Sequence, residues 1–204
     1  TIGIPLSQHE ITRRTTGHVC VKAPVFPFIK LRGLDPAPGP EMKSTGEVFG
    51  SDNRADLAYL KARLATEIPV ATEGGAYLTV REEDKVALIP IAQSLIDINF
   101  TIFATPGTAD VLRKANIPVT TSYRIAERMH PDSLDLMRKG DVNFIVNVPT
   151  ISGGAVRDGN MMRRLAVELN IPFVTTMRGA VMEVAAMKAR LENNLEPRRL
   201  EVHY

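Results

Sequence analysis

The sequence has little cysteine, few aromatic residues and no marked excess of charge of either sign. Cys20 is the single cysteine among 204 residues, so no internal disulfide can form, which fits a reducing compartment. The 25 basic and 23 acidic residues nearly balance, and 5% of residues are aromatic, so no surface for nucleic acid is indicated. No apolar run approaches the ~20 residues of a membrane helix, and no signal peptide is visible. We therefore expect a cytoplasmic protein that binds neither nucleic acid nor membranes.

The N-terminal quarter of the chain has no regular pattern of helices and strands. Residues 15–50 are rich in proline and glycine, with short strand-like runs at 18–23 and 25–31. Cys20 lies in the first of these runs, where we expect a small buried hydrophobic residue. Such a segment usually needs another part of a protein to pack against, and the sequence begins at Thr1 without methionine. We interpret the chain as a piece of a longer protein.

A helix and a linker follow this irregular part. Residues 51–67 carry leucines at spacings of three and four, a pattern that predicts a helix. Asp52 or Asn53 is expected to cap the helix, because short polar side chains accept hydrogen bonds from free backbone N–H groups. Residues 68–75 end in two glycines and are interpreted as a linker.

From residue 76 onward, strand-like and helix-like patterns alternate with short connections. Strands are expected at 76–80, 100–104, 117–122, 142–148 and 171–176, and helices within 82–98, 107–116, 130–141, 156–170 and 178–193. Pro90 falls inside the first of these helices and should bend it. The alternation predicts an α/β fold with a five-stranded, mostly parallel, doubly wound, Rossmann-like sheet. Such sheets bind ligands beyond the carboxyl ends of their strands.

One junction at that edge combines the features of an anion site. Thr105, Pro106, Gly107 and Thr108 join the second strand to a helix, whose N-terminus offers free N–H groups and partial positive charge. Gly107 permits a close approach of the backbone, although Thr108 could equally serve only as a helix cap. Lys85 begins the preceding helix, where a cation is unfavourable unless an anion lies nearby. The alternative for Lys85 is a solvated surface lysine.

Further polar side chains follow the later strands. Arg124 comes after the third strand, and Asn147, at the end of the fourth, could pair with a base or a sugar hydroxyl or simply close a turn. Asp158 begins the next helix, and the alternative to a binding role is that it caps this helix. Met161 and Met162 follow in the next turn, where a methionine more often belongs to the hydrophobic core than to the wall of a ligand site. Two cations, two hydroxyls and an amide gather on this predicted edge and suit a phosphorylated small molecule: Lys85, Arg124, Thr105, Thr108 and Asn147.

A catalytic constellation is not evident at the same edge. We find neither a carboxylate pair nor a nucleophile–base pair there. His130 and Asp132 could move protons, but MHPDS is better interpreted as a loop-to-helix junction capped by Asp132 or Ser133. The other histidines lie outside the regular region, so a histidine-rich metal site is not supported. We predict no catalytic residue and no metal site.

The N-terminal and C-terminal motifs resemble two consecutive parts of one protein family. Residues 21–50, VKAPVFPFIKLRGLDPAPGPEMKSTGEVFG, closely resemble the end of the second ATP-grasp half of the carbamoyl-phosphate synthase large chain. TVREEDK, FATPGTADVLRKANIPV, FIVNVPT, RDGNMMRRLAVELNIPFVTT and RGA match, in order and spacing, the methylglyoxal-synthase-like domain that ends that chain. The expected division is 1–50, ATP-grasp tail; 51–75, helix and linker; 76–195, methylglyoxal-synthase-like allosteric domain; 196–204, tail.

The resemblance implies a regulatory domain that binds a nucleotide effector, UMP as inhibitor or IMP as activator. It assigns the effector's phosphate to Lys85, Thr105, Gly107, Thr108 and Arg124. It assigns the sugar and base to Asn147, Thr150, Asp158, Met161 and Met162, and an ornithine-side contact to Thr175. The segment itself lacks the ATP-grasp metal ligands, so we expect it to hold no cofactor and to be non-catalytic alone.

The parent enzyme in this family makes carbamoyl phosphate from bicarbonate, glutamine-derived ammonia and two ATP, with Mg²⁺ or Mn²⁺, for pyrimidine and arginine synthesis. Its expected partners are the remainder of the large chain and a glutaminase small chain. The sequence leaves open whether the protein forms an oligomer. Some residues depart from the family pattern. Phe173 replaces the tyrosine of ornithine-responsive members, which argues against ornithine control, and NVPTIS leaves the identity of the effector open.

Two alternatives to a regulatory domain remain from the sequence. The first is a lyase of the methylglyoxal-synthase type that acts on a triose phosphate. The catalytic Gly-Gly-Asp of such an enzyme is not found after the third strand, and this argues against lyase activity. The second alternative is an assembly domain of the synthase that binds no nucleotide.

Overall fold

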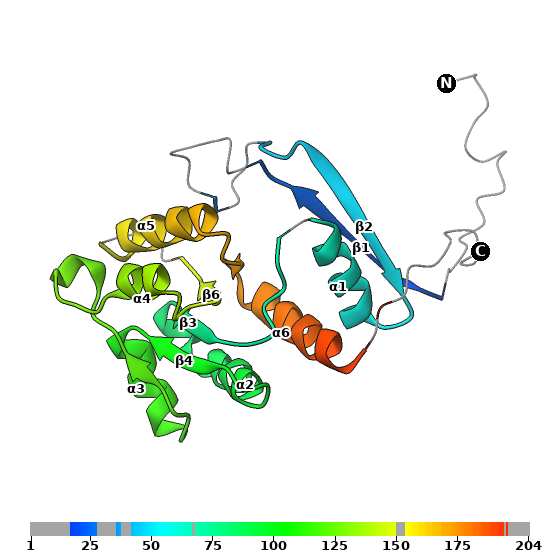
Figure 1. Cartoon of the computed structure of the whole chain (residues 1–204). Helices are drawn as coiled ribbons and strands as arrows, with labels where there is room; N and C mark the ends of the chain where they lie inside the picture. The colour runs from blue at the N-terminus through cyan, green and yellow to red at the C-terminus, as the bar shows by residue number, and fades with distance from the viewer. Residues whose placement is uncertain are drawn as a thin grey trace, which may run out of the picture.

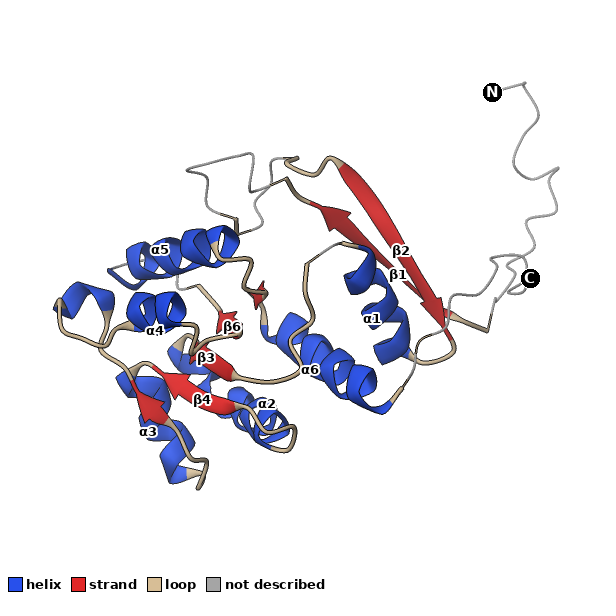
Figure 2. Ribbon diagram, in the orientation of Figure 1, coloured by secondary structure: helices blue, strands red, loops and turns tan. Residues whose placement is uncertain are grey.

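A two-stranded hairpin and one helix precede a five-stranded parallel sheet in the computed structural model of the chain (Figures 1 and 2). The structure describes residues 17–27, 36–37, 42–66, 68–149, 154–193 and 195. None of the helices in these ranges combines the length and the apolar character needed to cross a bilayer. The expected tail at 196–204 lies outside the described residues.

The hairpin consists of β1 (Val19–Val25) and β2 (Gly46–Asp52), which pair antiparallel. The expectation that Cys20 is buried is wrong: its side chain is exposed. From Cys20 onward the exposed residues of β1 alternate with half-buried ones, and the half-buried face turns toward α1 (Ala55–Ala65), which packs on both strands. The second run predicted at 25–31 lies largely outside the described residues, since only its first three residues are described.

The helix α1 lies so close to β2 that only glycine fits between them. A Cβ atom at Gly50 would lie 2.1 Å from the Ala58 carbonyl oxygen and 2.6 Å from the Ala62 nitrogen. The predicted caps of this helix are not found, because Asp52 is the last residue of β2 and Arg54 is the N-cap residue. Asp52 instead accepts a hydrogen bond from the Arg54 backbone N–H at 3.2 Å. The predicted domain boundary at residue 50 falls within β2, and the division itself stays a prediction.

The main sheet has the strand order β5-β4-β3-β6-β7, with every pair parallel. Its strands are β3 (Gly75–Thr79), β4 (Thr101–Ala104), β5 (Thr120–Thr121), β6 (Phe144–Asn147) and β7 (Phe173–Val174). The helices are α2 (Lys85–Ile96), α3 (Pro106–Lys114), α4 (Ser133–Lys139), α5 (Gly154–Glu168) and α6 (Met177–Glu192), with 3-10 turns η2 (Glu82–Asp84) and η3 (Ile125–Glu127). The predicted five-stranded, doubly wound α/β fold is confirmed. The edge strands β5 and β7 are shorter than predicted.

Helices cover both faces of the sheet (Figure 1). α2, α3 and α6 pack on one face against Leu78 and Phe144, whereas α4 and α5 pack on the other against Tyr77 and Ile145. All four residues of β6 are buried, as expected for a central parallel strand with side chains alternating between two covered faces. α2 continues through Pro90, which is exposed, so the carbonyl left without its N–H partner can bond to water.

The strand order creates a crevice at the carboxyl ends of β3 and β6. From β3 the chain crosses to β4 on one side, whereas from β6 it crosses to β7 on the opposite side. Thr79 and Asn147, the last residues of these two strands, stand opposite each other in the register. Connections that leave in opposite directions open a gap above the sheet, which is where doubly wound proteins bind their ligands.

Candidate functional site

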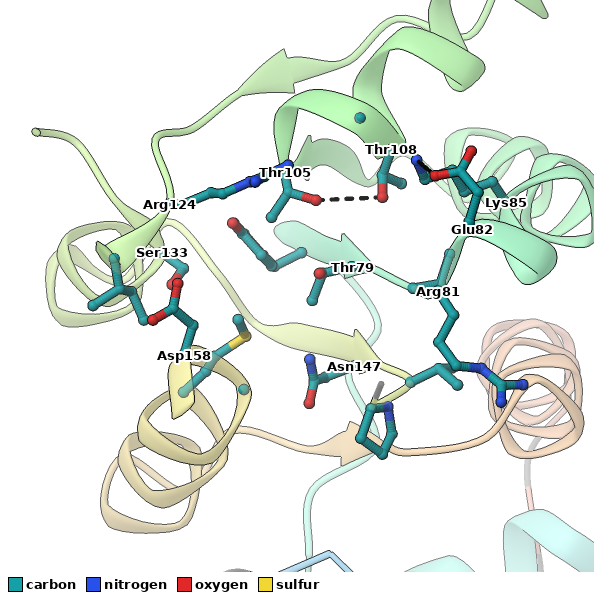
Figure 3. A pocket seen from close by; sticks show the side chains of 18 of the residues that line it. Thr79, Arg81, Glu82, Lys85, Thr105, Thr108, Arg124, Ser133, Asn147 and Asp158 are labelled. Atoms are coloured by element: carbon teal, nitrogen blue, oxygen red, sulfur yellow. Dashed lines mark hydrogen bonds and ion pairs between the residues drawn. The ribbon is translucent and has the colours of Figure 1, made fainter. Parts of the chain in front are cut away.

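A pocket of ≈ 460 Å³ opens at this crevice, lined by the ends of β3 and β6 and by the starts of α2, α3 and α4 (Figure 3). The loop before α4 and the second turn of α5 complete it. Eight of the residues predicted from the sequence line this one pocket: Lys85, Thr105, Gly107, Thr108, Arg124, Asn147, Asp158 and Met162. The structure thus brings together residues from five separate segments, and their role in binding stays a prediction.

The start of α3 forms one wall of the pocket. The cap residue of this helix is Thr105 and not Thr108, which had been considered as the alternative, because Pro106 occupies the first helical position, for which proline is well suited. Thr108 lies inside the first turn with 1% of its surface exposed. The Thr105 hydroxyl donates a hydrogen bond to that of Thr108 at 3.3 Å. Thr108 is therefore a buried wall residue whose hydroxyl faces Thr105 (Figure 3).

The backbone of this turn offers a ligand little more than one N–H group. Pro106 has no N–H, and the N–H groups of Thr108 and Ala109 already donate to the Thr105 carbonyl at 3.0 and 2.9 Å. Within the described ranges, the Gly107 N–H has no acceptor. An anion here would therefore rely mainly on side chains.

Lys85 brings a cation to the same corner. Its side chain is 12% exposed, and its Nζ lies 2.5 Å from a carboxylate oxygen of Glu82 (Figure 3). A Cβ atom at Gly107 would lie 2.9 Å from that Nζ. The absence of a side chain at Gly107 therefore leaves room for the ammonium group. The alternative of a solvated surface lysine is wrong for this residue, since its side chain is mostly covered.

Arg124 and Asp158 face the pocket from the opposite side. Arg124 is exposed and stands before η3, where its backbone N–H donates to Glu127 at 3.0 Å. The Asp158 carboxylate accepts a hydrogen bond from the Ala126 N–H at 3.3 Å, and this contact ties the loop to α5. The capping role considered for Asp158 is wrong, because α5 already begins at Gly154.

The two methionines predicted for the sugar and base differ in position. Met162 lies one helical turn beyond Asp158, is 3% exposed and lines the pocket. Met161 is 41% exposed and is not part of the pocket lining, because it points from a different face of α5. Thr150 lies outside the described residues. Thr175 follows β7, half-buried, and is also not part of the lining.

Asn147 forms the floor of the pocket with a fixed orientation. It is 5% exposed, and its side-chain oxygen accepts a hydrogen bond from an N–H of Arg163. Because a guanidinium group only donates, the amide must present its oxygen to Arg163 and keeps its NH₂ for the cavity. In Figure 3 the amide nitrogen points toward Thr79. A Cβ atom at Gly159 would lie 2.9 Å from Arg163 Nη1, so this contact also depends on a glycine.

Several lining residues were missed by the sequence prediction. Thr79, Arg81, Glu82 and Ser133 all line the pocket. Thr79 ends β3 and Arg81 lies two residues after it, so their place at the carboxyl end of a strand was a usable signal. Arg81 is held by Asp84 at 2.8 Å. Tyr77 also contributes to the lining but is 1% exposed and shares a hydrogen bond with Ser122 at 2.8 Å. Burial raises the pKa of Tyr77 to about 12.

His130, Asp132 and Asp135 do not line the pocket, although the nearby Ser133 does. Asp132 caps α4 as predicted, accepting hydrogen bonds from the N–H groups of Leu134 at 2.8 Å and Asp135 at 3.0 Å. His130 Nδ1 lies 2.5 Å from the Asp135 carboxylate, which raises the pKa of His130. Ligand-type atoms of His130, Asp132 and Asp135 lie within 4.8 Å of one another, although the cap and this pair already use them.

A second hollow lies at the opposite, amino-terminal edge of the sheet. It has a volume of ≈ 310 Å³ and is lined by the linker before β3 and by the turn between α5 and β7. Its walls include prolines and aliphatic side chains, and Glu73 is its single charged residue. Its lining therefore lacks the cations that gather at the first pocket, and Thr72 supplies its single hydroxyl group.

The chain is similar to known proteins both in its regular α/β part and over most of its length. Residues 87–175 match the family described as MGS-like domain. The carbamoyl phosphate synthase large chain, C-terminal section, of Methanocaldococcus jannaschii is 43% identical over 84% of this chain and 28% of the relative. Large chains of Archaeoglobus fulgidus and Rhizobium meliloti are 42% and 36% identical over 84% and 94% of this chain, each match covering 16% of the relative. The chain thus spans less than a third of the length of these relatives.

Proposed function

Because the chain belongs to the carbamoyl phosphate synthase large chain family and carries its MGS-like C-terminal domain, we propose that the pocket binds a regulatory nucleoside monophosphate. The observation that carries this proposal is the gathering of basic side chains, two threonine hydroxyls and an amide at the topological switch point. UMP and IMP are the effectors that we propose for it.

The phosphate belongs, in this proposal, at the start of α3. Lys85 supplies a charge-assisted donor, Thr105 and Thr108 supply hydroxyls, and Gly107 supplies the remaining N–H. Arg124 approaches from the facing loop, where its flexible and exposed side chain can reach a bound anion. Side chains therefore do more of the binding than in a phosphate loop made of backbone N–H groups.

The sugar and base belong in the deeper half of the pocket. The Asn147 NH₂ group can donate to a carbonyl or hydroxyl oxygen, and the Asp158 carboxylate can accept from a sugar hydroxyl. Met162 offers an apolar, polarisable wall for a flat ring. Both polar groups are already oriented by protein contacts, which lowers the ordering cost of binding.

Regulation follows if the nucleotide changes how this domain packs on the remainder of a large chain. The proposed mechanism is a shift between two packings, with a coupling free energy of about 1–3 kcal/mol in systems of this kind. The proposed parent enzyme makes carbamoyl phosphate from bicarbonate, glutamine-derived ammonia and two ATP with Mg²⁺ or Mn²⁺ bound elsewhere. A glutaminase small chain is its proposed partner, and the described segment is proposed to be non-catalytic alone.

Calorimetry tests the proposal directly. The chain is titrated with UMP and with IMP at low salt, and the titrations are repeated with Lys85→Ala and Thr108→Val. We expect binding of at least one nucleotide, and an affinity about tenfold lower in Lys85→Ala because a charge-assisted hydrogen bond is lost. Wild-type affinity in Lys85→Ala would show that the phosphate lies elsewhere. If neither nucleotide binds, the assembly domain is favoured. If the chain turns over dihydroxyacetone phosphate, the lyase is favoured.

A further inference from the structure

The three basic side chains of the pocket are neutralised to different degrees. Arg81 pairs with Asp84 at 2.8 Å, and Lys85 pairs with Glu82 at 2.5 Å. Arg124 forms no ion pair with any residue that the structure describes. Without a ligand, the lysine predicted to hold the phosphate is therefore already in contact with an anion of the protein itself.

The two members of the Lys85–Glu82 pair are held very differently. The Lys85 side chain is 12% exposed and its ammonium group lies over Gly107, so it has little freedom to move. The Glu82 side chain is 83% exposed and starts from the first residue of η2 at the rim of the pocket. The carboxylate can therefore swing into solvent at little cost while the ammonium group stays in place.

We propose that the Glu82 carboxylate occupies the anion position on Lys85 in the ligand-free protein and must be displaced by the phosphate of the ligand. This inference rests on the proposed function, because it assumes that the pocket receives a phosphorylated ligand. Glu82 thereby becomes a residue that sets affinity and selectivity. Figure 3 shows its carboxylate beside the Lys85 ammonium, at the end of the pocket where Thr108 lies.

Displacement by a phosphate favours one chemical class of ligand. A phosphate monoester carries between one and a half and two negative charges at neutral pH, whereas Glu82 carries one. The dianion therefore competes successfully for Lys85, while a monoanionic carboxylate gains no charge advantage and a neutral nucleoside cannot compete for the ammonium group. The internal carboxylate therefore makes the site selective for phosphorylated ligands over monoanionic carboxylates and neutral nucleosides.

Glu82→Gln provides the test, with Glu83→Gln as the matched control. Both substitutions remove one negative charge from the same turn, but Glu83 does not line the pocket and lies 3.4 Å from Arg81 instead. Each protein is titrated with UMP and IMP by calorimetry at low and high salt. We expect Glu82→Gln to bind about two- to fivefold more tightly, since an exposed carboxylate–ammonium pair is weak. The gain should shrink at high salt.

The possible outcomes separate this inference from the proposed function. Tighter binding in Glu82→Gln alone supports the displacement. Binding by the wild type without a gain in Glu82→Gln, or with equal gains in both variants, overturns the displacement and leaves the proposed function intact. If neither the wild type nor Glu82→Gln binds a nucleotide, both proposals fall.

Discussion

Gly107 shows at the scale of one residue how a missing side chain shapes the pocket. Its hydrogen leaves room for the Lys85 ammonium group, which would lie 2.9 Å from a Cβ atom at this position. The atom that would be crowded is the end of a flexible side chain and not backbone, so a larger residue would move the lysine without breaking the fold. The sequence analysis assigned this glycine a role because its backbone can approach a ligand closely. In the structure, its main effect is to leave room for the Lys85 ammonium group.

Gly107→Ala should therefore weaken nucleotide binding and leave stability intact. Alanine is the better helix former, so the free energy of unfolding should stay the same or rise by up to about 1 kcal/mol. The displaced ammonium group should lower the affinity for UMP or IMP severalfold, as measured by calorimetry. Gly46→Ala is the control, because nothing lies within 4 Å of a Cβ atom there. Unchanged affinity in Gly107→Ala would contradict this placement of Lys85.

His130 gives a prediction for the dependence on pH. Its hydrogen bond with Asp135 raises the pKa of the histidine and lowers the pKa of the carboxyl group. The raised pKa of His130 stabilises the fold at pH values below the unfolded-state pKa of about 6.5. This contribution is lost as the pH rises through the pKa of the folded state. The lowered pKa of Asp135 stabilises the fold at pH values above the unfolded-state pKa of about 3.9. That contribution is lost as the pH falls through the pKa of the folded state.

An NMR titration of the His130 ring checks this pairing. The pKa of His130 should be lower in Asp135→Asn than in the wild type, because the asparagine keeps the shape of the side chain but removes its charge. Identical His130 titrations would mean that the pair does not persist in solution.

At single positions, the features that could be predicted are those set by nearby residues in the chain. The cap at Asp132 is set by residues three apart in the chain, and the sequence shows it directly. The exposure of Cys20 and the burial of Thr108 depend on which surface another element covers, so neighbouring residues do not reveal them. The same holds for the contact between Arg163 and Asn147, which joins residues 16 positions apart.

At the scale of elements, one buried cluster joins α1 to α6. Glu183 is fully buried and accepts hydrogen bonds from Arg63 Nε at 2.8 Å, from Arg63 Nη2 at 3.1 Å and from the Tyr59 hydroxyl at 2.9 Å. Burial, and next the charge of Glu183, raise the pKa of Tyr59. The hairpin packs on α1, and α6 packs on the sheet, so this cluster is a polar link between the two parts (Figure 1).

Glu183→Gln should destabilise the chain markedly. Removing one partner from a buried pair leaves the Arg63 guanidinium without its counter-charge, which typically costs about 3–5 kcal/mol. The free energy of unfolding, measured with denaturant, should fall by roughly that amount. Glu192→Gln, at the exposed end of the same helix, should change it by less than about 0.5 kcal/mol. A small effect of Glu183→Gln would show that the cluster does not join the two parts.

At the scale of the whole molecule, the alternation of patterns was sufficient to predict the fold class. Short connections between apolar strands and amphipathic helices leave few topologies, and the doubly wound sheet is one of them. The strand order was not predicted, because nothing along the chain states on which side of β3 each later strand will pair. That order places the ends of β3 and β6 together and so decides where the pocket lies.

The pocket at the carboxyl ends of β3 and β6 is proposed to receive a nucleoside monophosphate. The most direct measurement is the change in backbone amide NMR shifts of the labelled chain on addition of UMP or IMP. We expect saturable changes at Gly107, Ala126, Asn147 and Gly159, and none at Asn170 in the hollow at the opposite edge. Changes confined to that opposite edge, or no changes with either nucleotide, would contradict this proposal.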